Sequence, residues 1–247
     1  DNCTSGTMSG TITDAVTGSA MFRVPIRWMP GMNRTNVYDF FLAIFWGTGG
    51  LTKTDANGDW SLSNMPAGWY SILASGTDNH YSDYFNAYSC GDQANQDLAL
   101  SPRLNPGEMR IMLSWPKIYP ATEAIDFDSH LFIPYTFDNG TQCDLDTNEV
   151  STSDGKCHLW FLTNQSDNVT VTGSNTRDYH YYGTGDYVTL DVDDTTAAGY
   201  ETITITKARS GVYSYSVLNH SDRGYAISHS RSTNFRKSRA KVRVLYN

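Results

Sequence analysis

Two short acidic motifs contain the residues most able to do chemistry. The first is Asp126-Phe127-Asp128-Ser129-His130, and the second is Leu190-Asp191-Val192-Asp193-Asp194. Because alternate residues of an extended strand lie on one face, each motif predicts two carboxylates side by side. Such carboxylates repel each other by about 1 kcal/mol at 4 Å in water, and by more when buried, unless a cation or a basic side chain neutralises them.

Calcium is the cation we expect at such a cluster outside cells, because it binds carboxylate and carbonyl oxygens. The predicted ligands are Asp126, Asp128, Asp191, Asp193 and Glu201. We expect His130 to hydrogen-bond one of these carboxylates without touching the metal. The alternative is that the acidic side chains pair with Arg, Lys or turn amides and bind no ion.

Other kinds of chemistry have weaker support. The sequence has no GxSxG, HExxH, GxGxxG or P-loop pattern, so the corresponding hydrolases, metalloproteases and nucleotide-binding proteins are not indicated. Paired carboxylates can act as acid and base in glycoside hydrolysis, but no apolar pocket is indicated that would raise one pKa. Asp144-x-Asp146-x-Asn148 resembles the start of an EF-hand loop, but Glu149 stands where glycine is needed. We therefore expect no enzyme activity.

The elements that must position the acidic motifs are β-strands. Runs with a period of two recur between Gly, Asn, Asp and Pro clusters, as at 10–13, 69–73, 187–192 and 202–205, and no helical stripe accompanies them. The chain is therefore predicted to be all-β, with two consecutive β-sandwiches. The apolar run Phe40–Trp46 is interpreted as a buried strand or, alternatively, as part of a partner surface. Two prolines and a glycine near 102–107 place the domain break, giving domains 1–105 and 106–247.

The first domain carries an ordered set of turn and strand motifs. They are Ser9–Gly18, a hairpin at Thr52–Leu62 that turns at Asn57-Gly58, and Met65–Ile72. This order resembles the carboxypeptidase-regulatory-like domain, a transthyretin-like β-sandwich, over residues 6–100. The resemblance implies a domain that accompanies a zinc peptidase and carries no catalytic residue of its own.

The second domain resembles the YfaP-like domain of bacterial secreted and surface proteins, over residues 108–247. The resemblance rests on Leu113-Ser114-Trp115, the two acidic motifs, Gly199–Ile203 and the terminal strand Ala240–Val244. This sequence departs from the pattern in a long insertion between the acidic motifs and in Tyr200-Glu201, where the family has Pro-Glu. The function of that family is not established, so the resemblance implies architecture and no activity.

Cysteines and glycosylation motifs indicate secretion. None of the four cysteines forms a CxxC pair, and we predict two disulfides, Cys143–Cys157 and Cys3–Cys90, with reduced buried thiols as the alternative. Six Asn-x-Ser/Thr motifs predict N-linked glycans. Their acceptors are Asn2, Asn33, Asn139, Asn164, Asn168 and Asn219. The chain starts at Asp1 without a signal-peptide pattern, so we expect a processed, extracellular protein.

The distribution of charge divides the chain. The 26 acidic residues exceed the 18 basic ones, and the resulting net charge of -8 argues against a nucleic-acid-binding protein. No apolar run is long enough for a membrane span. The last 17 residues hold six basic residues and no acidic one. Arg239, Lys241 and Arg243 alternate there with apolar residues, which predicts a strand with one basic face. This strand either protects a sheet edge or meets the acidic surface of another subunit.

These features predict an extracellular, glycosylated structural protein that self-associates into a homopolymer forming a surface fibre or matrix. The alternative is a monomeric adhesion or carbohydrate-binding module of a larger surface protein. The cluster Tyr179-His180-Tyr181-Tyr182 would supply the aromatic faces for glycans, although tyrosines also occur in strands for packing reasons.

Overall fold

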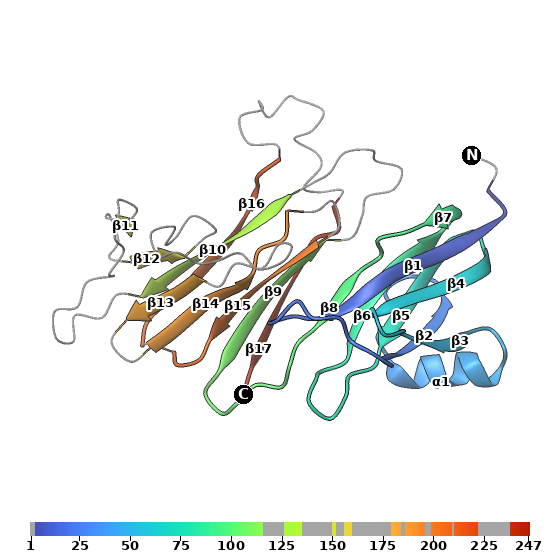
Figure 1. Ribbon diagram of the computed structural model, residues 1–247, viewed down its shortest axis with the longest axis horizontal. Helices are drawn as coiled ribbons and strands as arrows, with labels where there is room; N and C mark the ends of the chain where they lie inside the picture. The colour runs from blue at the N-terminus through green and yellow to red at the C-terminus, as the bar shows by residue number, and fades with distance from the viewer. Residues whose placement is uncertain are drawn as a thin grey trace. The chain divides into compact units, whose positions relative to one another are not determined.

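The computed structural model describes residues 3–115, 126–134, 150–151, 156–159, 179–183, 186–195, 199–208, 210–221 and 238–247. The chain divides into two compact units, Asp1–Arg103 and Leu104–Asn247, next to the break expected at residues 105 and 106. Apart from one short helix, the regular elements of the described residues are all strands (Figure 1), which confirms the all-β prediction. Among the described residues, no helix is long and apolar enough to cross a membrane.

The first unit contains two four-stranded sheets and the helix α1. One sheet has the order β4 (Asp59–Pro66), β1 (Ser5–Asp14), β7 (Gly91–Gln93), with β8 (Leu98–Leu100) pairing parallel to the end of β1. The other has the order β3 (Gly50–Lys53), β2 (Pro25–Pro30), β5 (Gly68–Ala74), β6 (Asp83–Ser89). Inward-facing side chains of both sheets, among them Met8, Ile12, Ile26, Trp60 and Ile72, form one core.

The hairpin predicted at Thr52–Leu62 is not formed, because β3 and β4 belong to different sheets. The turn between them has the expected chemistry: Asp55 Oδ1 accepts hydrogen bonds from the backbone N–H groups of Asn57 and Asp59, and Gly58 has a φ of 78°. Asn-Gly therefore marked the turn correctly. It could not show that the chain crosses from one sheet to the other there.

The prediction of a buried strand at Phe40–Trp46 is wrong, because residues Val37–Phe45 form α1. Asn36 caps the helix by accepting a hydrogen bond from the backbone N–H of Tyr38, and Gly47 follows its end with a φ of 71°. Phe40 and Ala43 face the unit and are buried. A short apolar run has no polar face to reveal a helical period, so periodicity alone could not separate helix from strand.

The second unit packs a five-stranded sheet against a four-stranded one. The larger sheet has the order β13 (Tyr179–Gly183), β14 (Asp186–Val192), β15 (Gly199–Ile205), β9 (Met109–Trp115), β17 (Lys241–Tyr246). The smaller has the order β11 (Val150–Ser151), β12 (Lys156–Leu159), β10 (Phe127–Pro134), β16 (Ser214–Asn219). All these neighbours pair antiparallel. Ile111, Leu131, Ile133, Leu190 and Ile203 form the centre of the core.

An irregularity in β14 decides where its acidic residues point. Leu190 pairs with Ile203 and Val192 with Thr202, so Asp191 is an extra residue in the ladder. Such a bulge interrupts the strict alternation of faces along a strand. Asp191 and Asp193, which alternation would place together, therefore reach different surroundings.

Candidate cation site

Three buried carboxylates meet between the two sheets of the second unit. Asp128 lies in β10, Asp193 directly follows β14, and Glu201 lies in β15. Each offers one oxygen to a group whose atoms all lie within 4.8 Å of one another. None of the three residues is more than 6% exposed. The structure thus brings together three of the five predicted calcium ligands, which we call the acidic triad.

Glu201 is the central member because it lies on the core-facing side of β15. It shares that face with Ile203 and Ile205, which belong to the hydrophobic core. Its Oε2 accepts a hydrogen bond from the backbone N–H of Ser129 in β10. The described residues of β12 pair with residues Leu131 to Pro134 of β10. Glu201 binds β10 at Ser129, outside this paired stretch. One carboxylate thereby bridges the two sheets.

The three carboxylates of the acidic triad are unfavourable when all of them are negatively charged. Burial raises the pKa of Glu201 well above its ordinary value, and the nearby charge of Asp193 raises it further. Among the described residues, Glu201 Oε1 is buried and has no hydrogen-bond partner. Burial also raises the pKa of Tyr215, whose Oη lies 2.7 Å from Ser129 Oγ, so this neighbour stays a neutral phenol. A shared proton or a bound cation would relieve the repulsion.

Asp191 belongs to a different network on the opposite face of the same sheet. Thr204 Oγ1 donates a hydrogen bond to Asp191 and accepts one of 2.9 Å from Nε of Arg110, and all three residues are buried. Asp191 thus lies in a buried hydrogen-bonded network that includes a basic residue, which agrees with the alternative to metal binding that the sequence left open. Arg110 and Thr204 could not be predicted as partners of Asp191, because they come from β9 and β15 and share no local motif with it.

Asp126 also lies apart from the triad. Its Oδ2 is 3.4 Å from Nδ1 of His220, and its backbone N–H donates to Ser221 Oγ. Both partners follow β16, so Asp126 helps to hold the start of β10 to the end of its neighbour. The structure therefore places Asp126 in a hydrogen-bonded strand end.

His130 faces another histidine instead of the expected carboxylate. Its Nδ1 lies 2.7 Å from Nε2 of His158 in β12, and the two rings stack with centroids 4.9 Å apart. Burial, together with the charge of His158, lowers the pKa of His130 to about 4. His130 is consequently neutral near pH 7, and a ring nitrogen of each histidine takes part in the contact. Nothing in the local sequence indicated His158 as the partner.

The triad suits a hard cation. Carboxylate oxygens are the ligands of Ca²⁺ and Mg²⁺, whereas the softer metals favour imidazole and thiolate. Asp128, Asp193 and Glu201 would hold the ion, and the ion would supply charge neutralisation between the sheets.

The cysteine prediction falls partly on described residues. Cys3 and Cys90 form a disulfide with a Cα–Cα distance of 5.4 Å, which closes a loop with a sequence separation of 87. It ties the start of β1 to the end of β6. Cys143 lies outside the described residues and only the backbone of Cys157 is placed, in β12, so their pairing stays a prediction. The Asp144–Glu149 segment also lies outside.

Two of the six glycosylation motifs fall on described residues. Asn33 is exposed with a φ of 59°, and its Oδ1 accepts a hydrogen bond from Asn86. Asn219 ends β16 and is half-buried. The other four acceptors, Asn2, Asn139, Asn164 and Asn168, lie outside the described residues, as do the side chains of the Tyr179–Tyr182 cluster, whose backbone forms β13.

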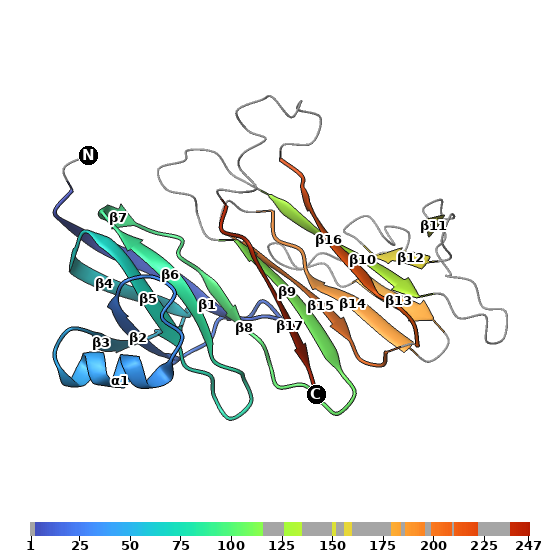
Figure 2. The ribbon, with the colours of Figure 1, turned by 180° about the vertical axis from the view of Figure 1, so that it is seen from behind.

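The predicted basic strand is β17, at the edge of the five-stranded sheet (Figure 2). Lys241 and Arg243 lie opposite Ser114 and Met112 of β9 and share their face of the sheet. Arg239 precedes the strand in an exposed left-handed conformation, with a φ of 56°. Val242, Val244 and Tyr246 occupy the other face, where they are between 43% and 80% exposed. We call these three apolar residues the β17 face.

Comparisons with known proteins assign this chain to no family. No family model matches the sequence, and no curated protein matches it. The two resemblances named above therefore stay predictions.

Distant similarities to solved structures were found. A candidate carbohydrate-binding protein from Pseudomonas aeruginosa is 13% identical, over 41% of this chain and 90% of that one, with a TM-score of 0.26. Another, from Bacteroides uniformis, is 14% identical over 87% of this chain and 98% of that one, with a TM-score of 0.29. The fimbrial protein FimP from Actonomyces oris is 11% identical over 89% of this chain, which spans only 57% of FimP, with a TM-score of 0.28. Similarities this small transfer no function, and the function must be argued from this chain's own residues.

Proposed function

We propose that this chain is an extracellular structural protein that assembles with copies of itself through the edge strand β17. The observation that carries the proposal is the combination of an edge position with exposed apolar side chains. An edge strand presents backbone hydrogen-bonding groups to any further strand. In β17 these groups are accompanied by Val242, Val244 and Tyr246, which are more than 40% exposed.

The location of these three residues strengthens the argument. Val242, Val244 and Tyr246 lie opposite Leu113, Ile111 and Met109 of β9, which face the core. The β17 face thus continues the core-facing side of the sheet. Its exposure shows that the described strands of the facing sheet do not cover it. A partner that covers this face would extend a hydrophobic core that already exists, which is favourable by about 25 cal/mol for each Å² buried.

An extracellular location is supported by the disulfide between Cys3 and Cys90. Disulfides persist in oxidising compartments and are rare in the cytosol. The exposed Asn33, which begins an Asn-x-Thr motif, is compatible with a glycan at that position. Both features support an extracellular location for the chain.

A divalent cation at the acidic triad fits the same function. Calcium bound by Asp128, Asp193 and Glu201 would cross-link the two sheets of the second unit where their charges otherwise repel. The support is the burial of all three carboxylates and the unsatisfied Oε1 of Glu201. The cation would then stabilise the unit that carries β17.

The state of assembly tests the proposal. Light scattering coupled to size-exclusion chromatography, followed by electron microscopy, should show oligomers or filaments of the full chain that grow with concentration. Val244→Asp should abolish them, because a charge on the β17 face cannot be buried without a partner. Val212→Ser, which changes a more exposed valine outside β17, should leave them intact. A wild-type chain that stays monomeric at all concentrations would overturn the proposal and favour the adhesion-module alternative.

A further inference from the structure

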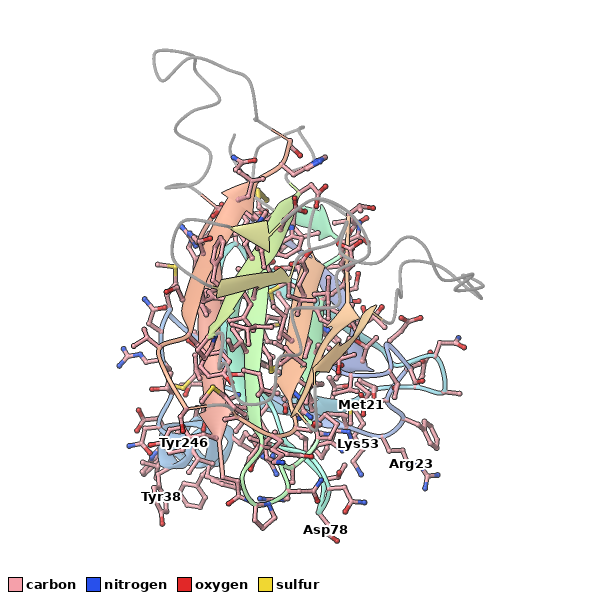
Figure 3. All side chains as sticks on the ribbon, turned by 90° about the vertical axis from the view of Figure 1, so that its left-hand side faces the viewer. Met21, Arg23, Tyr38, Lys53, Asp78 and Tyr246 are labelled. Carbon is pink, nitrogen blue, oxygen red and sulfur yellow. A yellow bond between two sulfur atoms is a disulfide. The ribbon has the colours of Figure 1, made fainter. Side chains whose placement is uncertain are left out.

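The outer side of α1 is an apolar surface exposed to solvent. Between Val37 and Trp46 the only charged residue is Asp39, so the helix has no polar face. Phe40 and Ala43 point into the first unit, and the opposite side presents Tyr38, Phe41, Leu42, Phe45 and Trp46. We call these five residues the α1 patch. Figure 1 shows α1 beside β2 and β3, and Figure 3 shows Tyr38 projecting outward.

The size of the α1 patch is that of an interface. Its five side chains are between 50% and 77% exposed. At about 200 Å² for each side chain of this size, they present on the order of 650 Å² of apolar surface. The largest apolar patch on a typical monomer covers roughly 300–600 Å², and each side of a standard protein interface buries about 800 Å². A helix that is apolar on every side is normally buried.

A positive charge lies within the α1 patch. The guanidinium of Arg27 stacks on the ring of Phe41, 4.9 Å from its centroid. A two-fold contact of the patch with itself would place Arg27 of both copies in one apolar interface, where like charges repel. This repulsion favours a different surface as the partner of the patch.

The same chain offers such a surface. Among the described residues, the exposed large hydrophobic side chains of the first unit include those of α1, and those of the second unit are Val212, Leu218 in β16 and the three residues of the β17 face. In the second unit, the β17 face is apolar and directs Lys241 and Arg243 to the opposite side of the sheet. An apolar patch with a basic neighbour can therefore dock on that face without meeting Lys241 or Arg243.

We propose that the α1 patch of one copy binds the β17 face of a second copy. The inference rests on the self-assembly proposed above and names the surface that β17 meets. Because the two surfaces differ, the contact is heterologous: every copy keeps one unused patch and one unused strand face. Contacts of this type propagate into a filament unless the rotation closes a ring.

Complementation between two variants tests the pairing. In the full chain, Phe45→Ser with Trp46→Ser removes the most exposed part of the α1 patch, and Tyr246→Ser or Val244→Asp removes the β17 face. Each variant alone should remain monomeric, because its copies share one defective surface. An equimolar mixture should form a 1:1 dimer of twice the 27.5 kDa chain and stop there, since the two remaining surfaces are both defective. Equal melting temperatures for the variants and the wild type show that folding is retained.

The outcomes separate this inference from the function on which it rests. If the α1 variant assembles like the wild type while the Val244→Asp chain does not, the pairing is wrong and assembly through β17 stands. A mixture that stays monomeric also overturns the pairing. If the wild type is itself monomeric and sediments with phosphatidylglycerol vesicles through Phe45 and Trp46, both proposals fail and a lipid surface occupies the α1 patch.

Discussion

The backbone N–H of Ser129 in β10 donates a hydrogen bond to Glu201 in β15, and this bond joins the two sheets of the second unit. The acceptor is a carboxylate inside a hydrophobic core, next to Asp128 and Asp193. A charged group in such a place is stable only when it is neutralised. The stability of the second unit should therefore depend on whether a proton or a cation neutralises Glu201 in the acidic triad.

Calcium should raise the melting temperature of the second unit. A ligand that binds only the folded state at 100 times its Kd adds about 2.7 kcal/mol, which corresponds to about 5–10 °C for a unit of this size. Glu201→Gln keeps the oxygen that accepts the Ser129 bond and removes one negative charge. In this variant the calcium-dependent shift should fall to near zero. Calorimetric scans with calcium and with chelator measure both effects.

The matched control for Glu201→Gln is Asp92→Asn, which removes an exposed carboxylate from the first unit. It should leave the calcium shift unchanged, because nonspecific screening of surface charge is the only effect that it can alter. Equal melting curves of the wild type with calcium and with chelator would contradict a cation at the triad and leave a shared proton as the neutralising species.

Thr204→Val should destabilise the second unit without affecting calcium. The hydroxyl of Thr204 donates to Asp191 and accepts from Arg110, and all three side chains are buried. Valine has nearly the same shape but no hydroxyl, so both neighbours lose a hydrogen bond, at a cost of about 2 kcal/mol in the free energy of unfolding. Urea unfolding measures this loss, and Thr195→Val, at an exposed position, is the control. A calcium shift that disappears in Thr204→Val would place Asp191 at the metal, against the structure.

Local patterns predicted the strands but not the long-range pairings. In β5 and β14 the runs Trp69–Leu73 and Tyr187–Val192 fall inside strands that the structure shows. The helix α1 was missed because both of its sides are apolar, one for the core and one for the exposed patch. The alternation of side chains along each strand predicted only part of the cation site. Asp128, Asp193 and Glu201 converge, whereas the bulge at Asp191 and the pairing of His130 with His158 depend on neighbouring strands that no local motif reveals.

Removal of the disulfide should destabilise the first unit. In the chain-entropy model, cross-linking residues 87 apart stabilises the folded state by about 4 kcal/mol. Cys3→Ser with Cys90→Ser avoids leaving a free thiol and should lower the melting temperature of the first unit while that of the second stays unchanged. Differential scanning calorimetry resolves the two transitions when the units unfold separately. A first transition at the wild-type temperature would show that the bond contributes little.

The hydrogen bonds of Asp14 predict a dependence of stability on pH in the first unit. The side chains of Asp14 and His80 lie 2.9 Å apart, and Asp14 Oδ1 also accepts the backbone N–H groups of Val16 and Thr17. Burial opposes ionisation of Asp14, but these hydrogen bonds outweigh it and hold its pKa below the ordinary 3.8. A lowered pKa means that the unfolded state takes up the proton first as the pH falls. The stabilisation is therefore complete above about pH 5 and is lost as the pH falls through the lowered pKa.

Asp14→Asn should remove this dependence. At pH 7 the variant loses the negative charge of the carboxylate that accepts these hydrogen bonds while its amide oxygen still accepts from the turn, so we expect a loss of about 1 kcal/mol in the free energy of unfolding. Below the lowered pKa of Asp14 the wild-type carboxyl is also uncharged, and the two proteins should converge. Urea unfolding at a series of pH values from 7 to 2 measures the difference. A constant difference across the series would show that the charge of Asp14 contributes nothing, and that only the shape of its side chain matters to the turn.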